Sequence, residues 1–274
     1  GLASTKRRHS PSIKDPPWIC EVSTLPIHGE KPLAAIALQR MQSNQIRMID
    51  ARKGGGLSLK ARLLFVSLLG AIGAWWFYDK LDVSSIGIPF MGPLDLGILF
   101  IPFFVIVMLA IYASGVIDGI DGLAGGVFAI IFMTYAAIAF AQDQIALATF
   151  DAALSGALFA FLWYNIPPAR FYMSETGSMA LTLALTLSAF TTDVLGDGVG
   201  VFVLPIIALP LAATVLTSAL QVFSKKVFKK KLFHIAPIHH HFEALGWPSY
   251  KVTMRYWIIT IIAGIFGLSL ALLK

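Results

Sequence analysis

The stretch LGILFIPFFVIVMLAIYASGVI, residues 96–117, contains no charged residue. An α-helix crosses the hydrocarbon core of a bilayer with about 20 apolar residues, so this run is long enough to span it. Of the 274 residues, 57% are hydrophobic and 13% are charged, whereas soluble domains carry about 25% charged residues. The sequence therefore predicts an all-α fold, a polytopic transmembrane helix bundle, and excludes a large soluble core.

Seven spans are predicted, with boundaries that hold to about 2–4 residues. We expect residues 1–48 to form a polar N-terminal tail with an amphipathic or interfacial helix, and residues 49–274 to form the membrane domain. The predicted spans are approximately 62–78, 96–117, 123–141, 144–163, 177–192, 198–223 and 256–273.

The basic residues predict the orientation of these spans. Cytoplasmic loops of membrane proteins carry an excess of Lys and Arg. If the N-terminus is cytoplasmic and the loops alternate, all basic residues except Lys80 and Lys274 fall on the cytoplasmic side. Three polar segments, DGIDG, PPARFYMSETGS and APIHHHFEALGWP, then share that side, and a bundle can bring them together.

Asp118 and Asp121 follow an apolar span and are flanked by glycines. Their i,i+3 spacing would place them on one face of a helix. Carboxylates at a membrane segment cost about 2.5–3.5 kcal/mol on insertion scales, so they usually face a cavity or a ligand. They are candidates for binding a divalent cation or for acting as a base. The alternative is an ordinary polar turn between two spans.

Three consecutive histidines, His239 to His241, precede Glu243. On a helix, at most one or two of them can face a site, where imidazoles bind phosphate or metal. The alternative is a solvated loop next to the lysine run SKKVFKKK, residues 224–231. That run is typical of a segment that anchors a protein to an anionic membrane surface.

Three motifs taken together resemble a known family. GVIDGIDGLAGG, FLWYNIPPARFYMSETGSMAL and FHIAPIHHHFEALGWPSYKVTMRYWIIT are similar, in this order, to the signatures of the phospho-N-acetylmuramoyl-pentapeptide transferases. These bacterial enzymes belong to the polyprenyl-phosphate N-acetylhexosamine-1-phosphate transferase superfamily. The similarity covers roughly residues 49–274, and the histidine motif is its most specific part.

The resemblance implies a function. Undecaprenyl phosphate would attack the β-phosphate of UDP-MurNAc-pentapeptide, with Mg2+ as cofactor, to give lipid I and UMP for peptidoglycan synthesis. The expected location is the bacterial plasma membrane, with the active site on the cytoplasmic face. The expected partners are the two substrates, the lipid bilayer and a second copy in a homodimer, and no nucleic acid. The alternative is an impaired family member that binds nucleotide-sugar or lipid phosphate without turnover.

The resemblance also implies roles for single residues. The catalytic residues would be Asp118, Asp121, Asp50, His239 and His240, and Asp118 and Glu175 would bind the metal. The substrate would be bound by Gly119, Ile120, Asp121, Tyr172, His239, His240 and His241.

The chain also departs from the family pattern. Gly115 stands at the family's asparagine, Glu175 at an aspartate and Asp50 alone where the family has an adjacent pair. Seven spans instead of about ten lead us to expect a chain shortened or divergent at its N-terminus.

Overall fold

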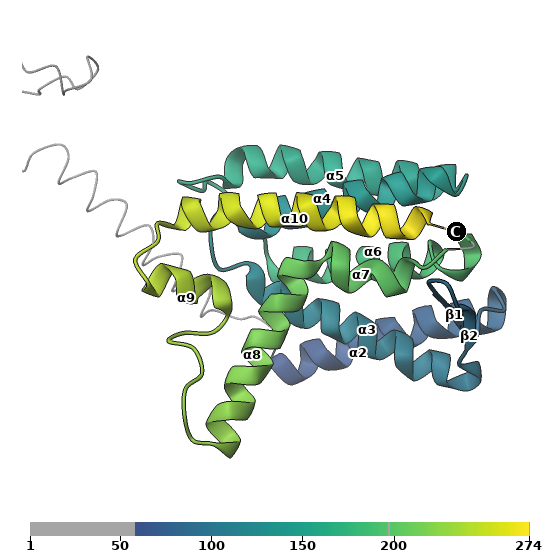
Figure 1. Ribbon diagram of the computed structural model, residues 1–274, viewed down its shortest axis with the longest axis horizontal. Helices are drawn as coiled ribbons and strands as arrows, with labels where there is room; N and C mark the ends of the chain where they lie inside the picture. Colours follow the sequence, from purple (N-terminus) through teal and green to yellow (C-terminus); the bar gives the residue numbers. More distant parts are fainter. Residues whose placement is uncertain (1–57, 197, 274) are drawn as a thin grey trace, which may run out of the picture. The chain divides into compact units, whose positions relative to one another are not determined.

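The computed structural model describes residues 58–196 and 198–273, without the side chains of Val116, Glu175 and Val194. The predicted tail, residues 1–48, and Asp50 lie outside the described residues. Helices dominate the fold, as predicted, and most run side by side in one bundle (Figure 1). In chain order the elements are α2 (Leu59–Trp75), η1 (Trp76–Lys80), β1 (Ser85–Ile88), β2 (Gly92–Asp95), η2 (Gly97–Leu99), α3 (Phe100–Ser114), η3 (Gly115–Ile117), α4 (Leu123–Ala141), α5 (Ile145–Asn165), α6 (Glu175–Thr191), η4 (Val194–Gly196), α7 (Gly200–Ile207), α8 (Leu209–Val227), α9 (Ile238–Ala244) and α10 (Ser249–Leu272).

Helix α4 is the most buried of the long apolar helices. In its most apolar 18-residue window 78% of the residues are buried, against 22–33% in the other four. It is apolar on all sides and carries small residues, which let neighbouring backbones approach closely. At Gly126 a Cβ atom would collide with the indole nitrogen of Trp257 in α10. The glycine therefore permits the close contact between α4 and α10.

Five helices in the described part of the chain are long and apolar enough to cross a membrane: Leu59–Lys80, Gly97–Ser114, Leu123–Ala141, Ile145–Asn165 and Ser249–Leu272. They correspond to five of the predicted spans, although α10 begins seven residues before the predicted residue 256. The predicted span 177–192 folds as α6, which is shorter than these five. The fold is thus a multi-pass helix bundle, as predicted.

The predicted span 198–223 is present, but it is not one straight helix. The chain forms α7 and α8 instead, and the two helices are bent by 74° at Ala208. Pro205 lies inside α7 and Pro210 lies in the first turn of α8. Proline lacks the backbone N–H and clashes with the preceding turn, so it breaks or kinks a helix. As a pair, α7 and α8 are apolar enough to count as a sixth, broken span.

A β-hairpin, which was not expected from the sequence, lies between η1 and α3. Strands β1 and β2 pair antiparallel, with Ser85 opposite Asp95. The buried carboxylate of Asp193 accepts hydrogen bonds from the backbone N–H of Gly87 (2.6 Å) and of Val201 (2.8 Å). Asp193 therefore ties the hairpin to the N-terminal end of α7.

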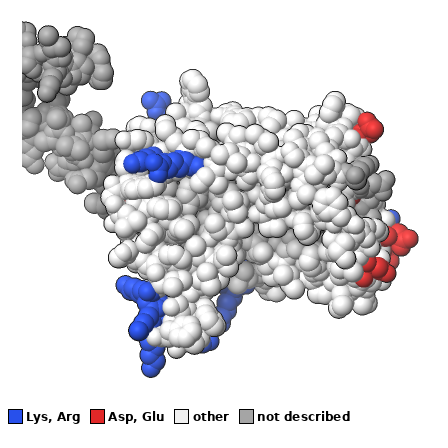
Figure 2. All heavy atoms as spheres, viewed as in Figure 1, with Lys and Arg blue, Asp and Glu red and all other residues white. Residues whose placement is uncertain are grey.

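The loops divide between the two ends of the bundle. The hairpin lies at one end with the loop before α7, whereas α9 and the loops around it lie at the other (Figure 1). Figure 2 shows Asp and Glu gathered at the hairpin end, and Lys and Arg mostly at the α9 end. The surface between the two ends is largely uncharged, as expected for a lipid-facing belt.

Candidate functional site

Asp118 and Asp121 lie where α3 and η3 end and α4 begins, at the α9 end of the bundle. Residues 118–122 form turns and a bend, with ψ of 53° at Asp118. The expectation that the two carboxylates share a helix face is therefore wrong. Gly122 has φ of 76°, a left-handed conformation that favours glycine, and it redirects the chain into α4. We call residues 118–122 the aspartate turn.

The side chain and backbone of Asp121 contact two distant segments. Its Oδ2 accepts a hydrogen bond from the backbone N–H of Ala169 at 3.1 Å, in the loop between α5 and α6. Its backbone carbonyl accepts a hydrogen bond from the hydroxyl of Thr253 in α10, also at 3.1 Å. The structure thus brings all three sequence motifs together, as the predicted loop placement required.

Gly122 is held by two residues that were not predicted as site residues from the sequence. Its N–H donates to Oδ1 of Asn165 (3.0 Å), and its carbonyl accepts from the indole N–H of Trp257 (3.1 Å). Asn165 also donates to the carbonyl of Phe171 (2.6 Å). Both residues lie in the motifs that carry the family resemblance, but neither an asparagine at the end of α5 nor a tryptophan within α10 is by itself a signal of these contacts.

Helix α9 places two histidines directly against the aspartate turn. A Cβ atom at Gly119 would lie 2.6 Å from Nε2 of His240 and 3.1 Å from Nε2 of His239. Glycine is the residue that allows this approach, since any side chain would meet the two rings. The predicted residues Gly119, His239 and His240 therefore form one cluster, and the adjacent Ile120 is buried.

Glu243 orients His240. The Nδ1 atom of His240 lies 2.7 Å from Oε2 of Glu243, and the hydroxyl of Ser249 donates to Oε1 of Glu243 at 2.7 Å. Burial opposes ionisation of Glu243, but the hydrogen bonds from Ser249 and His240 outweigh it and lower the pKa of its carboxyl. Since a carboxylate accepts, Nδ1 carries the proton and Nε2 faces Gly119.

His239 is fully buried, and neither of its ring nitrogens has a hydrogen-bond partner among the described residues. Burial, assisted by the neighbouring His240, lowers the pKa of its imidazole to about 4. His239 is therefore neutral at pH 7. A buried polar group without a partner is costly, so its placement beside the turn is consistent with a polar ligand.

The remaining predicted residues are not all brought into this cluster. The ring of His241 stacks on His234 instead, with 5.4 Å between ring centroids. Tyr172 is exposed in the loop before α6. The side chain of Glu175 and all of Asp50 lie outside the described residues. The roles expected for these four residues stay predictions.

Two cations of α10 lie over an aromatic ring that packs on α9. Arg255 and Lys251 lie over the ring of Trp247, with 4.1 and 4.9 Å to the centroid. Trp247 in turn stacks on Phe242 of α9 at 4.9 Å. Cation–π contacts of this kind fix charged side chains in place. The charges of Arg255 and Lys251 make this end of the bundle more positive, which suits an anionic ligand.

The described residues supply only part of a ligand set for the predicted metal ion. Among residues 58–196 and 198–273, no group of three or more His, Cys, Asp or Glu is placed to hold a metal ion. Magnesium at phosphate sites usually takes one or two carboxylates together with oxygens of the phosphate itself. Asp118 and Asp121 supply carboxylates of that kind, so the chemistry of the turn fits magnesium shared with a phosphate ligand.

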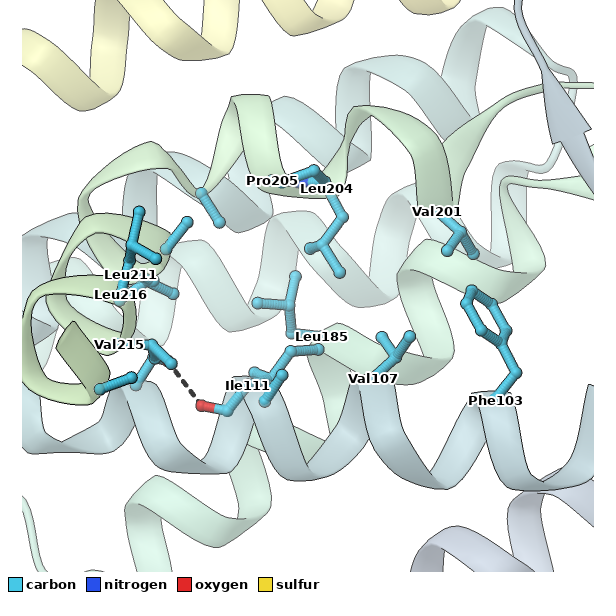
Figure 3. A pocket seen from close by; sticks show the side chains of 15 residues that line it. Phe103, Val107, Ile111, Leu185, Val201, Leu204, Pro205, Leu211, Val215 and Leu216 are labelled. Atoms are coloured by element: carbon cyan, nitrogen blue, oxygen red, sulfur yellow. Dashed lines mark hydrogen bonds between the residues drawn. The ribbon is translucent and has the colours of Figure 1, made fainter. Parts of the chain in front are cut away.

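An apolar groove of about 450 Å³ opens between α3, α6 and the bent pair α7–α8 (Figure 3). Phe103, Val107 and Ile111 line it from α3, and Leu211 and Val215 line it from α8. Ser114, the last residue of α3, also lines the groove and stands four residues before Asp118. The groove therefore reaches the chain segment that carries the aspartate turn.

Comparison with known proteins gives consistent matches. Residues 48–193 match the family model described as glycosyl transferase family 4. Proteins named phospho-N-acetylmuramoyl-pentapeptide-transferase from Rubrobacter xylanophilus and Dichelobacter nodosus are 34% and 36% identical, over 77% and 78% of this chain. The chain spans 65% and 64% of their respective lengths. A protein of the same name from Clostridium beijerinckii is 37% identical over 91% of this chain and 78% of its own.

We predict that Gly119→Ala displaces the ring of His240 and leaves the bundle folded. The added methyl group would meet Nε2 of His240, the free end of a side chain that can rotate away, and the contact with Glu243 would break. Histidine-selective NMR should show shifted His240 resonances. Gly156→Ala in α5 is the matched control, because nothing lies within 4 Å of its new Cβ. His240 resonances that match those of the parent would contradict the packing described here.

We predict that His239 does not titrate near neutral pH. The pKa of His239 is about 4 in the folded protein, below the ordinary value of 6.5, so the folded state accepts the neutral ring and disfavours the charged one. Folding is therefore most favourable above about pH 6.5, where the ring is neutral in the unfolded chain as well. That contribution to stability is lost as the pH falls from 6.5 towards 4. The resonance that disappears in His239→Gln should stay constant between about pH 5 and 8, the range in which ordinary histidines titrate. A midpoint near 6.5 would show that the ring is solvated.

Proposed function

Since the chain belongs to glycosyl transferase family 4 and is related to the phospho-N-acetylmuramoyl-pentapeptide-transferases, we propose that it catalyses their named reaction. Phospho-MurNAc-pentapeptide would pass from UDP-MurNAc-pentapeptide to undecaprenyl phosphate, giving lipid I for peptidoglycan synthesis and the bacterial cell wall. The observation that carries the proposal is the packing of the α9 histidines against Gly119, which unites the aspartate turn with the histidine motif.

In the proposed reaction an oxygen of undecaprenyl phosphate attacks the β-phosphorus of the nucleotide-sugar. The bond from that phosphorus to the bridging oxygen breaks, and UMP leaves. Magnesium, when bound, would neutralise charge on the diphosphate, with Asp118 and Glu175 as the proposed protein ligands. Asp50 keeps the catalytic role that the resemblance implies.

The residues beside the aspartate turn would position the nucleotide. Gly119 and Ile120 would contact the uracil, and Tyr172 would stack against it. His240, held by Glu243, directs Nε2 towards the turn and would donate to a phosphate oxygen when protonated. His239 is neutral and buried, so it would supply a hydrogen bond without charge.

The apolar groove supports the proposal that one substrate is a polyprenyl phosphate. Its lining is almost entirely apolar, and Ser114 connects it to the segment before Asp118. A lipid tail in the groove would leave its phosphate close to the aspartate turn, where a water-soluble nucleotide can reach it. Homodimerisation, which the resemblance implies, is part of the same proposal.

The assay is release of UMP from UDP-MurNAc-pentapeptide by the full chain in nanodiscs with undecaprenyl phosphate and Mg2+. Asp118→Asn and Asp121→Asn should each lower the rate at least about 100-fold, because charge stabilisation of the transferring phosphate is lost. Asp143→Asn is the matched control, since Asp143 is exposed in the loop between α4 and α5. No lipid-dependent UMP release by folded parent protein would favour binding without turnover.

We also propose that the aspartate turn and α9 face the cytoplasm. The gathering of Lys and Arg at that end supports this orientation. In a background with Cys20 replaced, Lys229→Cys should react with a membrane-impermeant thiol reagent only from the cytoplasmic side. Met91→Cys in the hairpin loop should react only from the outside. Labelling of both positions from one side would contradict the arrangement.

A further inference from the structure

Five lysines lie at the end of α8 and in the loop that follows: Lys225, Lys226, Lys229, Lys230 and Lys231. All five are exposed. We call them the lysine turn. The proposed transfer reaction gives them no role.

Two buried side chains of α8 fix the shape of the lysine turn. The Oε1 atom of Gln221 accepts hydrogen bonds from the backbone N–H groups of Leu232 and Phe233, both at 3.0 Å. The hydroxyl of Ser224 donates to the carbonyl of Lys230 at 2.9 Å. Lys229, with φ of 53°, lies at the reversal of the chain. The loop is thereby folded back along α8, and its ammonium groups are held within one short segment.

The charge of the lysine turn is not compensated within the described protein. None of the five lysines forms an ion pair with a residue of 58–196 or 198–273. The C-terminal dipole of α8 favours Lys225 and Lys226, which lie in its last turn. It does not account for the three lysines beyond the helix end.

The helix that carries these lysines also exposes apolar side chains. Leu216, Leu220, Phe223 and Val227 are at least 40% exposed. After the 74° bend, α8 leaves the direction of the other helices and extends beyond the bundle (Figure 1). A helix with exposed apolar residues that ends in lysines fits a bilayer, with its apolar side chains in the hydrocarbon and its ammonium groups at the headgroups.

We propose that the lysine turn binds the phosphate groups of anionic glycerophospholipids in the leaflet at the α9 end of the bundle. Clustered lysines next to a membrane attract anionic lipid in this way. Because Leu211, Val215 and Leu216 of α8 line the apolar groove, lipid bound at the end of α8 would also hold that wall of the groove in place.

The test uses the full chain in nanodiscs without either substrate, so its outcome does not depend on the proposed reaction. With Cys20 replaced, a donor fluorophore at Val222→Cys reports energy transfer to acceptor-labelled phosphatidylglycerol or phosphatidylcholine. Transfer to phosphatidylglycerol should exceed transfer to phosphatidylcholine by about twofold or more, and salt should reduce the difference. The triple variant Lys229→Gln/Lys230→Gln/Lys231→Gln should bring the two values together, whereas Lys80→Gln at the hairpin end should leave them unchanged.

Equal transfer to the two lipids in the parent protein would overturn the proposal, as would a preference that survives in the triple variant. Displacement of labelled phosphatidylglycerol by equimolar undecaprenyl phosphate would also overturn it, because the lysines would then belong to the substrate site. A matching thermal unfolding midpoint for the triple variant and its parent establishes that the comparison is made on folded protein.

Discussion

The contact between α10 and the first turn of α4 supports the whole candidate site. The indole of Trp257 occupies the space that a side chain on Gly126 would need, and its N–H donates to the carbonyl of Gly122. Thr253, one turn earlier on α10, donates to the carbonyl of Asp121. The aspartate turn is therefore fastened to α10, and α9, which carries the histidines, directly precedes α10. Small residues on α4 allow this approach, since helices in lipid associate through close packing rather than through the hydrophobic effect.

The bilayer explains why the chemistry lies at one end of the bundle. Backbone polar groups within hydrocarbon must be satisfied internally, so the loops that carry polar side chains gather at the helix ends. At the hairpin end the carboxylate of Asp193 is used to tie loop backbones together. At the opposite end Asn165 and backbone groups hold the aspartate turn, whose two aspartates are half-buried. Two histidines of α9 pack against this turn. Under the proposed function, that end would serve a water-soluble nucleotide and a membrane lipid at the same time.

The sequence predicted the helices well and the irregular segments poorly. A long uncharged run directly indicates a membrane-spanning helix. The same run does not show where the helix breaks, and the break at Ala208 depends on two prolines within it. The hairpin at 85–95 is too short for a clear alternating pattern, although its glycines and prolines are signals of turns. Assigning alternate loops to opposite sides of the membrane correctly predicted that the three motifs lie at one end of the bundle. The spacing of Asp118 and Asp121 misled, because the turn is not helical, and no spacing rule distinguishes the histidines that face Gly119 from His241.

We propose that the aspartate turn and α9 together form a nucleotide site. The decisive experiment is a structure of the chain with UDP-MurNAc-pentapeptide bound. We expect the uridine to lie against Gly119, Ile120 and Asp121, with a phosphate oxygen within hydrogen-bond distance of Nε2 of His240. A nucleotide at the hairpin end, or one bound away from both the aspartate turn and the α9 histidines, would contradict it.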